Sequence, residues 1–299
     1  MLPLTNFWMG FAGLLYLAVG VFILRKEIGV ARGLEKLIAL GCVFLAVSLA
    51  IFAPEHFHGG PSYIQEMAPS WMPVRAFWPY FVGCALLAAA TSLTVRKFVL
   101  LSSTLLGVMF FLFVCMIYVP SALANAKERL AWTLLLRDLS FSGGAWALAG
   151  LYSRAASASP QASKWMVLFG RMVISVAAIV FGLEHFLHPE FAPGVPLEQM
   201  MPAWVPLPSV WAYLAGAVLL TGGLGLALNK KPRMAAASIG ALMTFLTLFL
   251  YLPILILAHS GTTADVNEAL NYVGDTLLYA GAALALASAL PRDAGRVER

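Results

Sequence analysis

The sequence predicts an all-α membrane protein: a polytopic helical bundle with nine transmembrane helices, arranged as two parallel four-helix repeats plus an added N-terminal helix. Three observations support this fold class. The composition is 61% hydrophobic and only 11% charged, which is far from that of a soluble domain. The apolar residues occur in runs long enough to cross a bilayer. Polar and aromatic residues also recur along the chain at a nearly constant offset, which indicates an internal duplication.

The first expected span covers residues 7–24 and forms, with the following loop, an additional segment at 1–36. It lacks the basic residues that precede the apolar core of a signal peptide, and Arg25 and Lys26 follow it instead. We therefore expect a retained helix. The other apolar runs predict eight further spans, at residues 37–53, 77–95, 98–119, 130–152, 165–183, 210–228, 235–258 and 270–290.

The distribution of basic residues predicts the orientation. If the N-terminus lies outside, fifteen of the nineteen lysine and arginine residues fall on the inner side, and only Arg75, Lys127, Arg129 and Arg137 do not. This bias is typical of cytoplasmic loops, so we expect a multi-pass protein with its N-terminus outside and its C-terminus in the cytoplasm. The basic residues form no stripe with interleaved aromatics, and a nucleic-acid partner is therefore not expected despite the net charge of +5.

Two polar signatures lie 129 residues apart, and each follows the first helix of a repeat. Their members are Phe52, Glu55, His56 and Phe57 in the first copy and Phe181, Glu184, His185 and Phe186 in the second. A Pro/Trp-rich loop follows each signature, Pro-Ser-Trp-Met-Pro at 69–73 and Pro-Ala-Trp-Val-Pro at 202–206. Each copy holds four spans, an even number, so both copies should enter the membrane from the same side as parallel repeats. The expected units are 37–152 and 165–290, with a cytoplasmic linker at 153–164 and a cytoplasmic tail at 291–299.

A four-helix unit with this polar signature, this outer Pro/Trp-rich loop and a Gly-rich second helix resembles the DoxX/DoxD superfamily, here in tandem over residues 37–290. The resemblance implies a bacterial inner-membrane protein. It also implies a link to quinone or sulfur redox chemistry, because DoxD is a subunit of a thiosulfate:quinone oxidoreductase. Nothing in the residues themselves identifies thiosulfate.

The chemistry is expected on the outer side, where Glu184, His185 and His188 end the first helix of the second unit. Glu55, His56 and His58 occupy the matching positions in the first unit. Carboxylate and imidazole together can relay protons or bind a transition metal, but the spacing establishes no metal site, and none is predicted. The structural alternative is that these residues cap a helix and fix the loop that follows.

The last helix of each unit contains one carboxylate, Asp138 in the first unit and Asp275 in the second, about 10 Å from its outer end at 1.5 Å per residue. Glu268, Asn271, Asp275 and Tyr279 recur at helical spacing and predict a polar stripe that faces the bundle interior. Arg137 adjoins Asp138 and can neutralise it, so we favour the second unit for function. An interhelical hydrogen bond or ion pair is the structural alternative for both aspartates.

We therefore predict an outer-facing pocket in which Glu184, His185 and Asp275 are catalytic. The expected substrate-binding residues are Trp204, Trp211, Tyr251, Asn271 and Tyr279, and the first-unit equivalents of the catalytic residues are Glu55, His56 and Asp138. For the tryptophans, an aromatic belt at the membrane interface is the alternative role.

Three functional classes remain open from the sequence. A quinone-reactive oxidoreductase, or a subunit of one, fits the resemblance, with quinone as the expected cofactor and haem less favoured. A transporter or lipid-binding protein fits the repeats and the polar stripe, and a scaffold that binds partner subunits is the third class. Cys42, Cys84 and Cys115 are odd in number and form no C-x-x-C pair, so a dithiol relay is not expected. The expected partners are the lipid bilayer and a quinone or another small lipophilic substrate.

Overall fold

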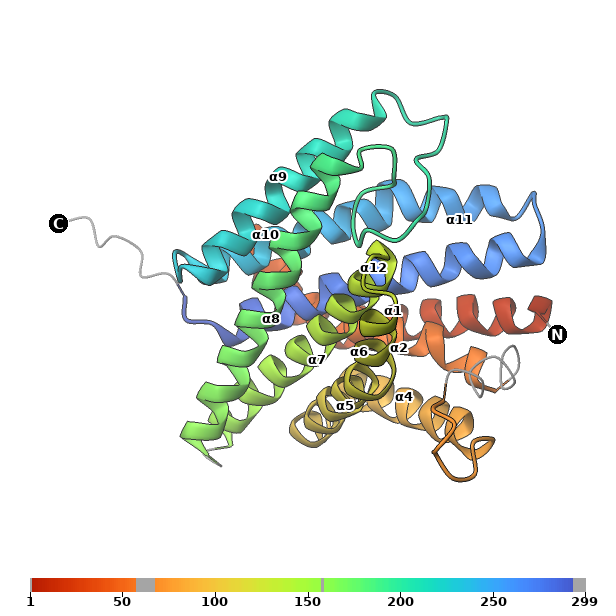
Figure 1. The fold of residues 1–299 in the computed structure, drawn as a ribbon. Coiled ribbons are helices and arrows are strands. Elements are labelled where there is room, and N and C mark those ends of the chain that lie inside the picture. The colour runs from red at the N-terminus through yellow and green to blue at the C-terminus, as the bar shows by residue number, and fades with distance from the viewer. Residues whose placement is uncertain (1, 58–67, 157–158, 293–299) are drawn as a thin grey trace.

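The structure is a computed structural model that describes residues 2–57, 68–156 and 159–292. His58, linker residues 157 and 158 and tail residues 293–299 lie outside the described residues. The regular secondary structure of these described residues is helical, apart from one isolated antiparallel bridge between Phe191 and Met200 (Figure 1). The predicted all-α helical bundle is confirmed.

The helices follow the apolar runs of the sequence. The long ones are α1 (Leu2–Val30), α2 (Leu34–Phe52), α4 (Phe77–Val95), α5 (Val99–Phe113), α7 (Arg129–Ala155), α8 (Pro160–Leu187), α9 (Pro208–Ala227), α10 (Pro232–Leu246) and α12 (Thr263–Ala289). The short helices α6 (Val119–Ala124) and α11 (Leu252–Ala258) continue α5 and α10 after one turn of π-helix each. A 3-10 turn, Ala53–His56, extends α2.

In the described part of the chain, eight helical segments are long and apolar enough to cross a bilayer. The ninth long helix, α7, has 27 residues, but it carries Arg129, Arg137, Asp138 and Arg154 and is less apolar. Large apolar side chains such as Phe7, Leu14 and Phe22 are exposed on α1, as expected where a surface faces lipid. The chain is a multi-pass membrane protein.

Eight of the long helices form a closed ring in which each contacts the next, in the order α2, α4, α5, α7, α8, α9, α10, α12 and back to α2. Helices α7 and α12 also contact each other across the ring and divide it into two lobes. The last helix of each half of the chain thus packs against the first helix of the other half. Helix α1 lies outside the ring, mainly against α2.

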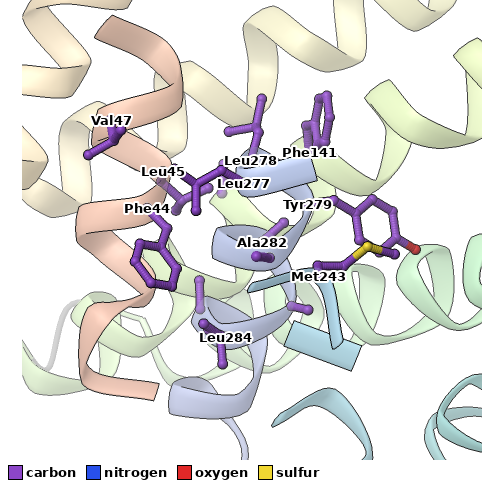
Figure 2. Close-up of a cluster of buried hydrophobic side chains, with 14 of the residues drawn as sticks. Phe44, Leu45, Val47, Phe141, Met243, Leu277, Leu278, Tyr279, Ala282 and Leu284 are labelled. Carbon is purple, nitrogen blue, oxygen red and sulfur yellow. The ribbon is translucent and has the colours of Figure 1, made fainter. Parts of the chain in front are cut away.

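Small residues allow the central helices to approach closely. A Cβ atom added at Gly41 of α2 would lie 3.0 Å from the backbone nitrogen of Ala285 in α12, and one added at Gly170 of α8 would lie 3.1 Å from the side chain of Ala147 in α7. Such contacts are typical of helix pairs in membranes, where close packing drives association. Figure 2 shows the apolar core around α12, with Phe44 and Leu45 on one side and Phe141 and Met243 on others.

Several backbone details recur at an offset of 133 residues. The left-handed residues Val74, Arg96 and Phe98 correspond to Leu207, Asn229 and Lys231. The π-helical turns Val114–Tyr118 and Thr247–Tyr251 correspond in the same way. Each precedes a proline, Pro120 or Pro253, whose ring clashes with the carbonyl four residues earlier and so widens the helix there. Tyr118 and Tyr251 are the last residues of these two turns.

Candidate functional site

A cavity of about 1020 Å³ lies between α2, α4, α5, α7 and α12, in the lobe built mainly from the first half of the chain. This volume is at the upper end of the range for pockets that take a drug-sized ligand. Most of its wall is apolar, with side chains that include Phe52, Phe81, Leu86, Met109, Phe110, Leu112, Phe113, Met116, Ile117 and Leu278. A few polar and charged groups interrupt this wall, which is the usual composition of a small-molecule site.

The main polar cluster of the cavity is centred on Arg137 of α7. Its guanidinium donates to Asp275 of α12 through Nη1 at 3.0 Å and to Asp138 through Nε at 2.9 Å. The Arg137 Nη2 atom lies 2.8 Å from Asp138 and 3.3 Å from the hydroxyl oxygen of Tyr118, to which it donates. All three charged side chains are largely buried, with exposures of 13% for Arg137, 5% for Asp138 and 11% for Asp275. One cation thus faces two carboxyl groups, which leaves either one negative charge or one carboxyl proton in the cluster.

A second polar cluster in the same cavity is centred on Glu55, directly after α2. Its Oε1 atom accepts hydrogen bonds from the side-chain amides of Asn267 and Asn271 on α12, each at 2.9 Å. Asn267 also donates to Asn6 of α1 at 3.1 Å. The His56 ring lines the cavity as well, with Nδ1 3.1 Å from the carbonyl oxygen of Phe52. Glu55 therefore ties α2 and α12 together, and through Asn267 it is connected to α1.

The matching residues of the second half have different surroundings. His185 Nδ1 lies 2.5 Å from the carbonyl oxygen of Phe181, and its Nε2 accepts a hydrogen bond from the backbone N–H of Gly194 at 2.9 Å. The ring is therefore the neutral tautomer with its proton on Nδ1. Glu184 lies 3.6 Å from Arg129. The cavity beside these groups measures about 10 Å³, which is room for one water molecule at most.

The loop after α8 fills the space in the second lobe. Residues 192–197 are all buried. The Pro193 carbonyl accepts a hydrogen bond from the Tyr251 hydroxyl at 3.0 Å, and the Pro196 carbonyl accepts one from Arg129 at 2.8 Å. Gly194 has a φ of 136°, a backbone conformation that favours glycine. In the first lobe the equivalent tyrosine, Tyr118, lines the cavity.

At the surface of this loop, the Glu190 carboxyl lies 3.2 Å from His188 Nδ1. A hydrogen bond from its own backbone N–H, followed by the bond to His188, holds the pKa of Glu190 below its usual value. This pair belongs to the loop and lies apart from the large cavity.

The structure does not bring Glu184 and His185 together with Asp275. Asp275 and Asn271 line the large cavity beside Glu55, His56 and Asp138, whereas Glu184 and His185 line the small one. The physical reason is the central crossing of α7 and α12, which turns Asp275 toward Arg137 and the first lobe. The catalytic roles of these residues remain predictions.

The predicted substrate-binding residues are also separated. Trp204 and Trp211 are exposed at the ends of the second lobe, and Tyr251 is buried against the loop. Tyr279 is fully buried, with its ring 5.7 Å from Phe181 and 6.5 Å from Phe141. Of this set only Asn271 lines the large cavity.

Sequence reasoning missed Tyr118 and Asn267 as site residues and took Arg137 as a partner of Asp138 alone. The position of Tyr118, 133 residues before Tyr251, was a signal that could have found it. Asn267 lies one turn before Asn271 on the polar stripe of α12 and was detectable in the same way. Within the described residues, no group of three or more His, Cys, Asp or Glu side chains is placed to hold a metal ion.

Comparison with known proteins identifies one family. Residues 166–252, which cover most of α8, α9, α10 and the turn that follows, match the family model DoxX. No curated protein matches the chain, and no solved structure matches it. The chain is a multi-pass membrane protein whose residues 166–252 are similar to the DoxX family.

Proposed function

We propose that the chain binds a quinone in the cavity between α2, α4, α5, α7 and α12, and that it acts as a quinone-reactive membrane protein or as a subunit of an oxidoreductase. The observation that carries the proposal is an apolar cavity of about 1020 Å³ with Arg137, Asp138, Asp275 and Tyr118 in its wall. A quinone has the same character, because it joins a flat head with two hydrogen-bond acceptors to an apolar tail.

The hydrogen-bonding groups of the cavity suit such a head. The Tyr118 hydroxyl oxygen accepts a hydrogen bond from Arg137, so its own proton is free to be donated to a carbonyl oxygen of the ligand. A phenol held in this way is preorganised, and little side-chain freedom is lost when the ligand binds. The ring of Trp78 and the phenyl groups of Phe81 and Phe113 provide flat apolar surface in the same wall.

The carboxyl groups of the cavity suit the proton chemistry of a quinone. Reduction of a quinone to a quinol takes up two protons with two electrons, and we assign the electrons to a donor outside this chain. Asp138 and Asp275 share one guanidinium, so the pair can hold or release one proton while each carboxyl group keeps its contact with Arg137. Glu55 and His56 are further proton-exchanging groups in the same wall.

We further infer that residues 37–152 and 165–290 are duplicated DoxX-type units. The family match to 166–252, the recurring left-handed residues and the two π-helical turns support this. The hydrogen bonds from Trp78 to Pro73 and from Trp211 to Pro206 recur in the same register. In this proposal the second unit has lost its cavity to its longer loop, and the first unit has kept it.

The basic-residue bias supports the orientation that we propose, with the N-terminus outside and the C-terminus in the cytoplasm of a bacterial inner membrane. The end of α2, with Glu55, and the start of α12, with Asn267, then lie at the outer side. The polar clusters of the cavity belong to this outer half of the bundle.

A matched pair of tyrosine variants tests the proposal. Tyr118→Phe removes the hydroxyl that faces the cavity, and Tyr251→Phe removes the equivalent hydroxyl that is bonded to Pro193. One lost hydrogen bond of about 1 kcal/mol should weaken quinone binding about fivefold in Tyr118→Phe, while Tyr251→Phe should bind as the unchanged protein does. Binding is measured by titrating a short-chain benzoquinone into the protein in nanodiscs and following tryptophan quenching.

The same titration separates the alternatives. If the unchanged protein binds no quinone but retains a specific lipid through purification, the lipid-binding function replaces the proposed one. Equal loss of affinity in both tyrosine variants would show that the ligand does not occupy the cavity of the first lobe.

A further inference from the structure

We propose that the cavity opens sideways into the bilayer between α4 and α5, and that its ligand is therefore a membrane-dissolved amphiphile with a polar head and a long apolar tail. This inference rests on the proposed quinone site and adds the class of ligand and its route of entry. It begins from two side chains that line the cavity and are also about half exposed.

The rim of the proposed opening consists of Phe81 on α4 and Leu112 on α5. Both side chains line the cavity, and both are among the exposed large apolar side chains, with 49% of Phe81 and 47% of Leu112 exposed. Trp78 and Met116 line the cavity beside them and are half-buried. A side chain that belongs both to a cavity wall and to the outer surface marks the edge where the two meet.

The depth of this rim places it in hydrocarbon. Helices α4 and α5 are joined by a tight turn on the inner side, between Val95 and Val99. Phe81 lies fourteen residues before Val95, and Leu112 lies thirteen residues after Val99, so both are about 20 Å from that turn at 1.5 Å per residue. An apolar core about 30 Å thick covers this height. The rim therefore faces lipid tails.

In the second lobe, aromatic side chains close the corresponding contact between α9 and α10. Leu112 corresponds to Phe245 at the offset of 133, and Met116 corresponds to Phe249. The Phe245 ring stacks with Trp211 across α9 and α10, with centroids 6.3 Å apart, and Phe249 lies 4.8 Å from Phe245. In the first lobe Trp78 packs instead on Phe77 and Phe81 of its own helix. In the second lobe an aromatic contact thus connects α9 and α10. In the first lobe Leu112 and Met116 stand at the positions of Phe245 and Phe249.

The difference between the lobes suggests which residues to exchange in a test. The double variant Leu112→Phe, Met116→Phe places in the first lobe the side chains that Phe245 and Phe249 provide in the second. Leu105→Phe is the matched control, because Leu105 lies two turns from Leu112 on α5, is 58% exposed and does not line the cavity. Phe81→Ala is the opposite change, since it removes a ring from the rim.

The protein in proteoliposomes is mixed with vesicles that carry a long-tailed quinone, and tryptophan quenching is followed in time. We expect the double phenylalanine variant to associate about fivefold more slowly or worse, Leu105→Phe to match the unchanged protein, and Phe81→Ala to associate faster. Affinity for a water-soluble short-chain quinone should change less than about twofold in Leu105→Phe, whereas Phe81→Ala also removes part of the apolar wall and is therefore judged by its association rate. If the double variant also loses affinity for the short-chain quinone, the added rings fill the cavity itself. The association rate of Phe81→Ala with the long-tailed quinone then tests the opening.

Two failures are distinguishable. If the unchanged protein binds neither quinone, the proposed function is wrong, and the proposed lateral opening, which rests on it, is wrong as well. If the unchanged protein binds both quinones but the double variant and Phe81→Ala associate with the long-tailed quinone at the unchanged rate, the binding site stands and the lateral opening is overturned.

Discussion

Replacement of Arg137 by methionine is the perturbation that tests the polar cluster most severely. The guanidinium contacts Asp275 at 3.0 Å and Asp138 at 2.8 Å, and 13% of the Arg137 side chain is exposed. Removing the cation leaves two carboxyl groups in the core without their counter-charge. Breaking a buried ion pair by removal of one partner costs about 3–5 kcal/mol, and we expect a loss of stability in that range for Arg137→Met.

The aspartate variants should cost less and in a defined order. In Asp275→Asn the guanidinium keeps Asp138, and the amide oxygen can still accept from Nη1, so we expect a loss of about 1 kcal/mol. Asp138→Asn should cost more, because Asp138 takes contacts from both Nε and Nη2 and is the least exposed member. The sequence placed Arg137 beside Asp138 alone, whereas the structure also gives Arg137 a contact with Asp275.

The decisive comparison is a non-additive one. The triple variant Arg137→Met, Asp138→Asn and Asp275→Asn carries no charge in the cluster, and it should be more stable than Arg137→Met alone although it has lost more interactions. Free energies of unfolding are measured in mixed micelles of a mild detergent and sodium dodecyl sulfate. A cost below about 1 kcal/mol for Arg137→Met, or a triple variant less stable than the single one, would refute the assignment of a buried, charge-coupled cluster.

Two further predictions concern topology and the loop of the second lobe. An extracytoplasmic reporter fused after Met72 or Pro196 should be active, and one fused after Lys97 or Lys231 should be inactive, because the basic residues mark the inner side; the reverse pattern would invert the proposed orientation. His185→Leu removes the acceptor for the buried N–H of Gly194 and should cost about 1–3 kcal/mol of stability. Short-chain quinone binding by that variant should be unchanged, since His185 lies outside the large cavity. A loss of binding without unfolding would show that the quinone binds in the second lobe.

Much of the helical layout could be predicted from the sequence, because crossing a membrane imposes length and apolarity on each span. The structure extends several helices beyond the apolar runs. α1 reaches Val30, since Arg25, Lys26 and Glu27 are good helix formers that need not lie in lipid. Glu55 and His56 lie in the turn that extends α2, and Glu184 and His185 lie in the last turn of α8.

The location of the cavity could not be predicted in this way. The two halves have nearly the same signature, and the difference arises from how the loop around Gly194 packs, which depends on tertiary contacts with Tyr251 and His185. The ion-pair partner of Asp275 could not be predicted from the sequence either. Arg137 is 138 residues away, and only the central crossing of α7 and α12 brings them together.

Mapping the position of a bound quinone tests the central claim most directly. A photoreactive short-chain benzoquinone is bound to the protein in nanodiscs, illuminated, and the labelled peptides are identified by mass spectrometry, with an excess of unreactive quinone as the control. We predict labelling that the unreactive quinone suppresses in α4, at residues 78–86, and in the end of α5 and the π-helical turn after it, at residues 109–118, where the wall of the large cavity lies. Competable labelling confined to residues 181–216, around His185 and Trp211, would contradict the account.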